Sequence, residues 1–166
     1  PLLTEYRFLG TRWSPYSTFF QILCRSRKLA GAGSYDDEAW SDSSLDVMER
    51  LERCGARFTI SGLDNVRALS GPAVFVANHM STLETNLLPG LISPIRICTF
   101  FVKEKLLHGP IWGPIMRSRH PIAVTRTDAR KDLDTVMAEG ARYPAEGRPI
   151  IIFPPGTRQA RFLPPE

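Results

Sequence analysis

Short apolar runs alternate with stretches of helix-forming residues over most of the chain after residue 55. The runs at residues 73–77 and 149–153 are continuous and rich in β-branched side chains, which is typical of strands buried on both faces. Strands and helices that alternate in this way predict an α/β fold. We therefore expect a mixed, largely parallel sheet flanked by helices and preceded by N-terminal amphipathic helices.

Hydrophobic periodicity and turn signals divide this region into individual elements. Strands are predicted at residues 56–65, 71–79, 96–103, 121–126 and 148–158, the last of which runs into a loop. Helices are predicted at residues 81–92 and 128–147, and a turn-rich connection is predicted at residues 109–119.

A further helix with ordinary start and stop signals is predicted at residues 36–55. Acidic residues come early, arginines come late, and Gly55 follows the expected end. Its apolar residues form one stripe, which we expect to face the core. The stripe consists of Trp40, Leu45, Val47, Met48 and Leu51.

The segment at residues 11–30 joins an aromatic, apolar part to a basic end. The apolar part contains Trp13, Tyr16, Phe19, Phe20, Ile22 and Leu23, and the basic end contains Arg25, Arg27 and Lys28. One interpretation is a helix in the bilayer interface, with its cations near lipid headgroups. The other is a helix docked on its own domain. We expect residues 1–54 to form a helical, membrane-proximal segment and residues 55–166 to form the α/β domain.

The charge balance of the chain is a mild basic excess. Its 21 Lys and Arg against 17 Asp and Glu give a net charge of +4, which suits phosphate-bearing ligands or an anionic membrane surface. No dense basic tract, zinc finger, RNP or KH motif occurs, so we expect no nucleic-acid partner. Because no run of about 18 apolar residues is present, we expect no membrane-spanning helix, and no signal peptide is visible.

The three cysteines favour a reducing compartment. Cys24, Cys54 and Cys98 are odd in number, widely spaced and without a CxxC pair. Cys98 stands among apolar residues, where an inert buried thiol is the usual outcome. We predict no metal site and no cofactor.

The stretch VFVANHMSTLET, residues 74–85, places a histidine where a predicted strand ends and a helix begins. Ligands of α/β folds collect at such junctions. A neutral imidazole at His79 suits general-base work near physiological pH, and the carboxylate of Glu84 suits the support of the resulting imidazolium. Residues five apart lie about 140° apart around a helix, so the two side chains meet only if His79 precedes the helix.

A structural interpretation of the same stretch stays open beside the catalytic one. Ser81 and Glu84 form an S-x-x-E capping box, in which Glu84 bonds back to the backbone NH of Ser81. His79 is then a hydrogen-bonded turn residue.

Three ordered blocks of the sequence resemble the glycerolipid acyltransferase family, which includes 1-acylglycerol-3-phosphate acyltransferase. NHMSTLE matches its N-H-x4-D/E block at His79 and Glu84, and GPIMRSRHPIAVTR resembles its middle block, which ends in an arginine at Arg126. A lysine after a strand matches at Lys103. The E-G-T-R block resembles Pro155, Gly156, Thr157 and Arg158.

The resemblance implies transfer of a fatty acyl group from acyl-CoA or acyl carrier protein to a hydroxyl of a lysophospholipid or glycerol phosphate acceptor. His79 is then the general base, Glu84 orients it, and no covalent acyl-enzyme is needed. Substrate-binding roles fall on Lys103, Arg126, Gly156, Thr157 and Arg158, with arginine forks for phosphate and backbone NH groups for the oxyanion. The resemblance also implies peripheral or monotopic attachment to the cytosolic face of a membrane.

The sequence departs from the family at its last block. Pro155 stands where the family has glutamate, and proline supplies neither a carboxylate nor an NH. A phosphate-free acceptor and a lysophospholipid with a larger headgroup therefore stay open as substrates. The sequence also stops before the family's final apolar block, so we expect the acyltransferase domain at residues 55–166 to be C-terminally incomplete.

Two other functions are considered. Pro155 motivates a non-catalytic, lipid-binding relative of the acyltransferase fold. A hydrolase with Ser81 as nucleophile is disfavoured because the chain lacks a G-x-S-x-G elbow.

Overall fold

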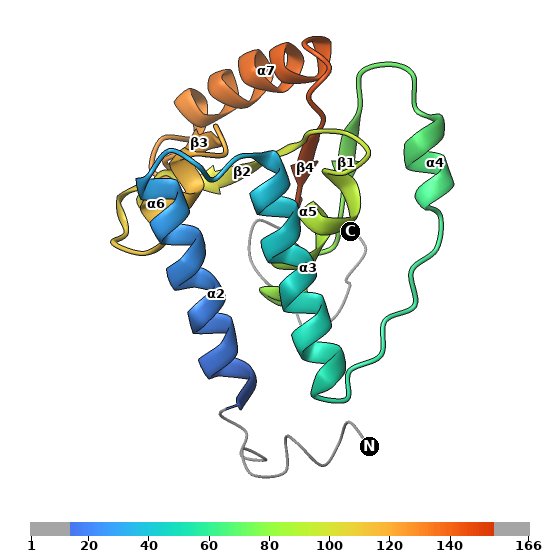
Figure 1. The fold of residues 1–166 in the computed structure, drawn as a ribbon. Coiled ribbons are helices and arrows are strands. Elements are labelled where there is room, and N and C mark those ends of the chain that lie inside the picture. The colour runs from blue at the N-terminus through green and yellow to red at the C-terminus, as the bar shows by residue number, and fades with distance from the viewer. Residues whose placement is uncertain (1–13, 155–166) are drawn as a thin grey trace.

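The computed structural model describes residues 14–154 of the 166-residue chain. In chain order the elements are α2 (Ser14–Gly31), α3 (Asp37–Arg53), α4 (Leu63–Ala68), β1 (Val74–Val76), α5 (Leu83–Ile92), β2 (Thr99–Lys103), the 3-10 helix η2 (Glu104–His108), α6 (Trp112–Arg117), β3 (Ile122–Val124), α7 (Ala129–Ala145) and β4 (Ile150–Ile152). Figure 1 shows their arrangement.

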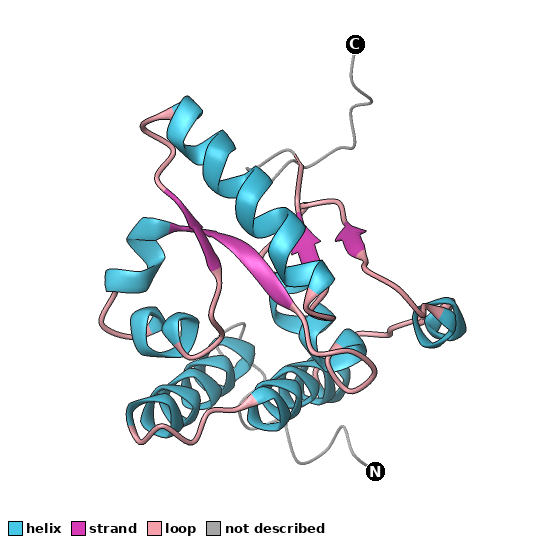
Figure 2. Cartoon of the chain, turned by 90° about the horizontal axis from the view of Figure 1, so that it is seen from above, coloured by secondary structure: helices cyan, strands magenta, loops and turns pink. Residues whose placement is uncertain are grey.

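The described strands form one parallel sheet in the order β1-β4-β2-β3. Phe75 lies opposite Ile151, and Ile151 lies opposite Phe100. Helix α7 lies on one side of this sheet, and α2 and α3 lie on the other, as Figure 2 shows. The predicted α/β fold with a largely parallel sheet is therefore confirmed.

The alternating direction of side chains along β2 places its residues in both helical layers. Phe100 and Val102 belong to a core cluster with Trp40 of α3, whose ring meets the edge of the Phe100 ring at a centroid distance of 5.6 Å. On the other side, a Cβ placed on Gly140 of α7 would lie 3.9 Å from Cζ of Phe101. The central strand thus holds the two layers together.

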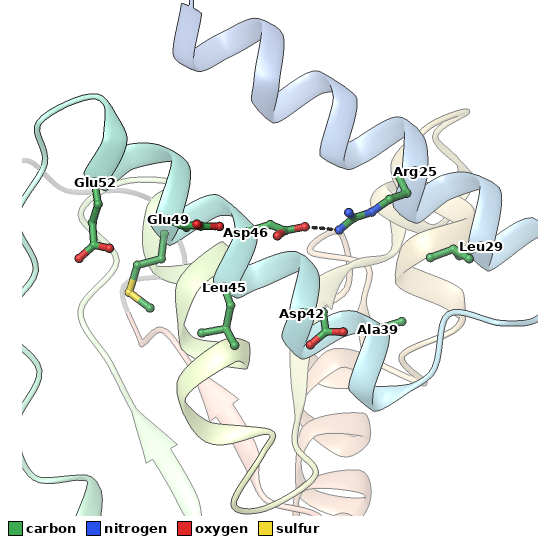
Figure 3. A pocket seen from close by; sticks show the side chains of 9 residues that line it. Arg25, Leu29, Ala39, Asp42, Leu45, Asp46, Glu49 and Glu52 are labelled. Carbon is green, nitrogen blue, oxygen red and sulfur yellow. Dashed lines mark hydrogen bonds and ion pairs between the residues drawn. The ribbon is translucent and has the colours of Figure 1, made fainter. Parts of the chain in front are cut away.

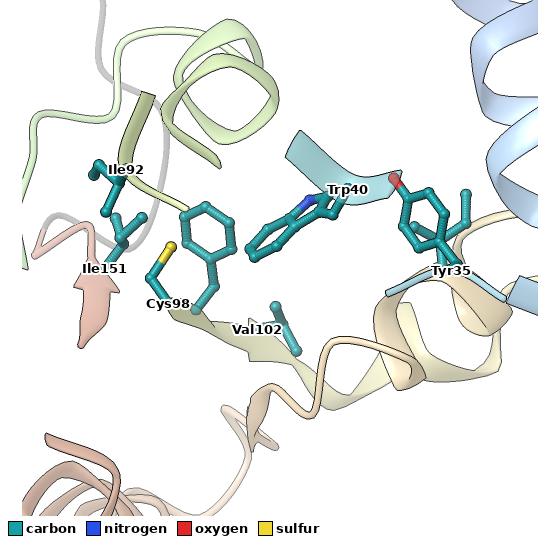
Figure 4. Packing of buried hydrophobic residues seen from close by; sticks show 8 residues of the cluster. Tyr35, Trp40, Ile92, Cys98, Val102 and Ile151 are labelled. Carbon is teal, nitrogen blue, oxygen red and sulfur yellow. The ribbon is translucent and has the colours of Figure 1, made fainter. Parts of the chain in front are cut away.

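The main core also draws on the N-terminal helices and contains a cysteine (Figure 4). Tyr35 and Trp40 pack with Ile92, Cys98 and Ile151. Burial raises the pKa of the Cys98 thiol to about 12. Cys98 is therefore the inert buried thiol that the sequence predicts. The predicted division into a helical segment at residues 1–54 and an α/β domain at residues 55–166 stays a prediction.

The predicted helix at residues 36–55 forms as α3. The side chain of Asp36 caps it by accepting a hydrogen bond of 2.9 Å from the NH of Ala39. Trp40 and Val47 are buried, as the apolar stripe predicts. The prediction is wrong for Leu45, which is 40% exposed because it lies on the side of α3 that faces a surface hollow.

Helix α2 packs against α3 and α6, with Ile22 buried. This side of α2 is docked on its own domain, while Phe20 on the same helix is 54% exposed. Trp13 and the side chain of Tyr16 lie outside the described part. Binding to a bilayer stays a prediction. No helix within residues 14–154 combines the length and the apolar character needed to cross a membrane.

The expectation that residues 73–77 form a strand buried on both faces is wrong. Val74 is 48% exposed and Val76 is 67% exposed, because among the described strands β1 is an edge strand paired only with β4. The similar run at residues 149–153 forms β4, which lies between β1 and β2. Ile150 and Ile151 are accordingly fully buried.

The strand predicted at residues 56–65 and the connection predicted at residues 109–119 also differ from the structure. Residues 56–62 form no strand, and α4 follows them after Gly62, whose φ is 79°. Residues 109–119 contain helix α6 in place of a purely turn-rich connection. Pro114 is compatible with this helix because a residue in the first turn needs no intrahelical partner for its NH. Gly113 is required there, since a Cβ would lie 2.7 Å from the carbonyl oxygen of Leu107.

Candidate functional site

The carboxyl ends of the parallel strands bring the predicted polar residues to one edge of the sheet. His79 follows β1 by three residues, and Lys103 is the last residue of β2. Arg126 follows β3 by two residues, and Phe153 is the first residue after β4. Residues that are far apart in the sequence therefore converge on one side of the fold.

Glu84 organises the turn between His79 and α5. Its Oε1 accepts hydrogen bonds from the NH groups of Met80 at 2.7 Å and Ser81 at 2.8 Å, and its Oε2 accepts one from the Ser81 hydroxyl at 2.9 Å. The Ser81 hydroxyl oxygen also accepts a hydrogen bond from the NH of Leu83 at 2.9 Å. The capping contact predicted from the S-x-x-E pattern is therefore confirmed.

The same carboxylate lies near the histidine. Oε2 of Glu84 is 4.0 Å from Nδ1 of His79, which is an ion-pair distance and longer than a hydrogen bond. Capping and proximity to the imidazole thus coexist in one side chain. The turn ahead of α5 places His79 outside the helix, as the contact between residues five apart requires.

Glu84 is ionised more readily than an ordinary glutamate. Burial acts to raise its pKa, but hydrogen bonds from backbone NH groups and from the Ser81 hydroxyl outweigh burial and lower it. The carboxylate therefore carries its negative charge near the His79 ring at neutral pH. Such a charge stabilises an imidazolium.

The His79 ring lies against an aromatic pair. Its centroid is 4.7 Å from that of Phe153, and the Phe153 ring stacks on Phe100 at 6.0 Å. Within residues 14–154, Nδ1 of His79 is buried and has no hydrogen-bond partner. A buried ring nitrogen without a partner is unusual, and a catalytic role is one explanation for it.

A cavity of about 510 Å³ has His79, Lys103 and Arg126 among its lining residues. Most of its wall is apolar and comes from α2, α3, β2 and α6. Examples are Ile22, Leu23, Trp40, Trp112, Ile115 and Met116. Glu84 is not among the residues that line the cavity. The site combines one imidazole and two cations with an apolar space.

A second hollow of about 540 Å³ lies between α2 and α3 (Figure 3). Its wall carries four carboxylates, from Asp42, Asp46, Glu49 and Glu52. Arg25 forms an ion pair with Asp46 at its edge. None of the residues predicted to be functional lines this hollow, and its negative charge disfavours phosphate-bearing ligands.

The profile of the Acyltransferase family matches residues 57–163, a range that contains His79, Glu84, Lys103 and Arg126. The chain belongs to the acyltransferase family. The resemblance found in its sequence motifs is therefore confirmed.

Curated relatives of this acyltransferase-family chain carry one name, 1-acyl-sn-glycerol-3-phosphate acyltransferase. The Pseudomonas aeruginosa relative is 32% identical over 104 residues, which cover 63% of this chain and 38% of the relative. The Chlamydomonas reinhardtii relative is 33% identical over 102 residues, which cover 61% of this chain and 30% of the relative. The chloroplastic relative of Arabidopsis thaliana is 29% identical over 102 residues, which cover 61% of this chain and 28% of the relative.

The chain spans about a third of the length of these curated relatives. No solved structure matches it significantly. Pro155, Gly156, Thr157 and Arg158 of the family's last block lie outside the described residues, so their predicted roles stay predictions.

Among the residues that sequence reasoning missed is Asp132, in the first turn of α7 beside the loop that carries Arg126. Its carboxylate accepts hydrogen bonds from the backbone of Thr125 and Arg126. The available signal was an aspartate six residues after the arginine of the middle block, near the start of a predicted helix.

Proposed function

We propose that the intact protein is an O-acyltransferase of lipid metabolism. It moves a fatty acyl group from a thioester donor to a hydroxyl of a lysophospholipid or glycerol phosphate acceptor. One observation carries the proposal: His79 lines a largely apolar cavity together with Lys103 and Arg126. The family membership and the printed names of the curated relatives agree with it.

The proposed reaction needs one base and one nucleophile. The acceptor oxygen attacks the thioester carbonyl carbon while His79 takes its proton. We assign this step to Nε2, because Nδ1 is the ring nitrogen that faces Glu84. The tetrahedral oxyanion then collapses, the carbon–sulfur bond breaks, and the thiolate takes the proton from the imidazolium. The products are an ester and a free thiol, and Glu84 stabilises the imidazolium between the two proton transfers.

The two cations on the cavity wall support binding of a phosphate. Arg126 offers a planar fork for two phosphate oxygens, and Lys103 adds a second positive charge. Within residues 14–154 neither side chain forms an ion pair with a carboxylate, so both charges are available to a ligand.

The apolar wall supports binding of an acyl chain. A volume of about 510 Å³ lies within the usual range of ligand pockets. Both acyl-CoA and acyl carrier protein carry such a chain on a phosphopantetheine thioester, and both stay as donors in the proposal.

The last block of the family contributes to the proposal through sequence position. Gly156, Thr157 and Arg158 follow Phe153, which packs against His79, by three to five residues. This proximity along the chain supports an oxyanion role for backbone NH groups near Gly156 and Thr157 and a phosphate role for Arg158.

Peripheral or monotopic attachment to the cytosolic face of a membrane is part of the proposal. The exposed side chains of Phe20 and Lys28 on α2 support it, since an aromatic ring and a cation on one helix suit an anionic interface. The membrane would deliver the lysolipid acceptor to the cavity.

Mass spectrometry of reaction products tests the proposed activity. The intact protein is incubated with labelled acyl-CoA or labelled acyl carrier protein and a mixture of acceptors. The acceptors are glycerol 3-phosphate, lysophosphatidic acid, lysophospholipids with larger headgroups and monoacylglycerol. We expect a new labelled ester on a phosphate-bearing acceptor. Free fatty acid released without any acceptor would instead support a hydrolase.

The non-catalytic alternative rests on Pro155, which replaces the family's glutamate. Lysolipid binding without donor consumption across the whole panel would favour it over the enzyme. A gain of transfer in Pro155→Glu would identify the proline as the cause.

A further inference from the structure

The loop between β3 and α7 contains a strained arginine. Arg126 has a φ of 61°, a left-handed conformation in which the Cβ of an L-residue approaches its own carbonyl oxygen. A residue other than glycine stays in this conformation only where its surroundings hold it. The contacts of the loop therefore decide where the Arg126 side chain lies.

Asp132 supplies these contacts from the first turn of α7. Its Oδ2 accepts a hydrogen bond of 2.6 Å from the NH of Arg126. Its Oδ1 accepts bonds of 2.7 Å from the NH and 3.0 Å from the hydroxyl of Thr125. The Thr125 hydroxyl oxygen in turn accepts a bond of 3.2 Å from the NH of Thr127. The carboxylate thus holds Thr125 and Arg126 directly, and Thr127 through the Thr125 hydroxyl.

Asp132 is not needed to start the helix. Asp128 already caps α7, because its Oδ1 accepts hydrogen bonds from the NH groups of Arg130 at 3.1 Å and Lys131 at 3.0 Å. The Asp132 carboxylate is instead directed at the loop. Burial acts to raise its pKa, but the bonds from Thr125 and Arg126 outweigh burial and lower it, so the carboxylate is charged at neutral pH.

The side chain that this loop presents lines the same cavity as His79 and Lys103. A guanidinium binds a phosphate through a planar fork, so its value as a ligand depends on its direction as well as its charge. If residue 126 relaxed to a right-handed or extended conformation, the side chain would leave the backbone in a different direction.

We propose that Asp132 is a positioning residue, which holds the backbone of Arg126 so that the guanidinium faces a phosphate group of a substrate in the cavity. The inference rests on the proposed acyl transfer and goes beyond it by naming a residue that touches no substrate. The phosphate belongs either to the acceptor or to the donor, and the two sources are separated by measuring KM for each.

A double-mutant cycle on the intact protein tests this role. Asp132→Ala is expected to raise KM by about tenfold for the substrate whose phosphate Arg126 binds, with kcat changed much less. Arg126→Ala is expected to raise the same KM. In the Arg126→Ala background, Asp132→Ala should add no further increase, because the side chain that it positions is already absent.

The source of the phosphate follows from which KM responds. An increase in KM for lysophosphatidic acid but not for monoacylglycerol assigns the phosphate to the acceptor. An increase for acyl-CoA alone assigns it to the donor. Asp134→Ala is the matched control, since Asp134 is an exposed acid on the same helix, and its KM values should equal those of the wild type.

A merely structural role gives a different pattern. The inference would be overturned if Asp132→Ala lowered kcat equally in the wild type and in the Arg126→Ala background, or if a folded Asp132→Ala variant kept an unchanged KM. Either result leaves the proposed activity intact. If the wild type transfers no acyl group, the proposed activity fails. In that case calorimetric titration with lysophosphatidic acid and with coenzyme A measures Kd for the same set of single and double variants. Unchanged Kd values in Asp132→Ala would overturn the inference.

Discussion

Nδ1 of His79 lies 4.0 Å from Oε2 of Glu84, while the same carboxylate accepts hydrogen bonds from the NH groups of the two residues after His79. Glu84 therefore holds the turn that carries the histidine and also places a negative charge beside its ring. A single substitution at Glu84 therefore affects both the stability of the fold and the proposed chemistry. The pH dependence of the free energy of unfolding measures the first effect by itself.

Glu84→Gln is expected to lower stability by about 1–3 kcal/mol at neutral pH, because charge-assisted hydrogen bonds to Met80 and Ser81 are weakened. The pKa of Glu84 is lowered in the folded state, so its stabilising contribution is present above the ordinary value of 4.5 and is lost as the pH falls through the folded-state value. Denaturant titrations of both proteins should therefore converge in acid. A stability difference that stays constant far below pH 4.5 would contradict this, and Glu104→Gln, an exposed acid, serves as the control.

Asp37→Asn is expected to destabilise the fold by about 3 kcal/mol, because it leaves a buried guanidinium without its counter-charge. Nη1 of Arg119 donates to Oδ1 of Asp37 at 2.6 Å, and only 7% of the Arg119 side chain is exposed. The pair joins the start of α3 to the residues that precede β3. Chemical denaturation measures the loss. Glu38→Ala on the same helical turn is the control, and an equally small loss in both variants would contradict the role of the pair.

The fold follows from the sequence where local pattern and final environment agree. The run at residues 149–153 is apolar on both sides and becomes β4, which has a neighbouring strand on each edge. Asp36 and Gly55 flank α3 as ordinary start and stop signals predict. Position in the sheet was not predictable, because the equally apolar run at residues 73–77 becomes an edge strand. Strand order depends on long-range pairing, which a local pattern does not contain.

The site was predictable to a similar extent. His79 and Arg126 each follow a strand and Lys103 ends one, and parallel strands bring their carboxyl ends together, so their shared cavity follows from the topology. Asp132 was missed because its role depends on the left-handed backbone of Arg126, which no propensity of arginine indicates. The apolar wall supplied by α2 and α3 was missed because helix docking is set by packing across the whole fold.

Met116→Trp is expected to shorten the acyl chains that the protein accepts, because Met116 lines the cavity and the larger ring occupies part of it. Each excluded methylene should lower the preference for a long donor by about fourfold. Competition between labelled short-chain and long-chain thioesters measures the change. Met137→Trp is the control, since Met137 is 66% exposed on α7 and lies away from the cavity. An identical chain preference in both variants would place the acyl chain elsewhere.

Lys103→Ala is expected to raise KM for a phosphate-bearing acceptor by about tenfold and to leave a phosphate-free acceptor unaffected. Lys103 lines the cavity, whereas the exposed Lys105 two residues later does not. Lys105→Ala therefore controls for loss of positive charge. Steady-state kinetics with lysophosphatidic acid and monoacylglycerol provide the comparison. Equal effects of the two substitutions would show that net charge matters and that the cavity position of Lys103 does not.

The rate of acyl transfer by His79→Ala in the intact protein tests the central claim most directly. The account predicts a loss of about a hundredfold or more, with an unchanged far-ultraviolet circular dichroism spectrum, because the base is removed while the turn held by Glu84 remains. His108→Ala, at an exposed position in η2, should keep the wild-type rate. A folded His79→Ala variant that transfers acyl groups as fast as the wild type would contradict the assignment of His79 as the base.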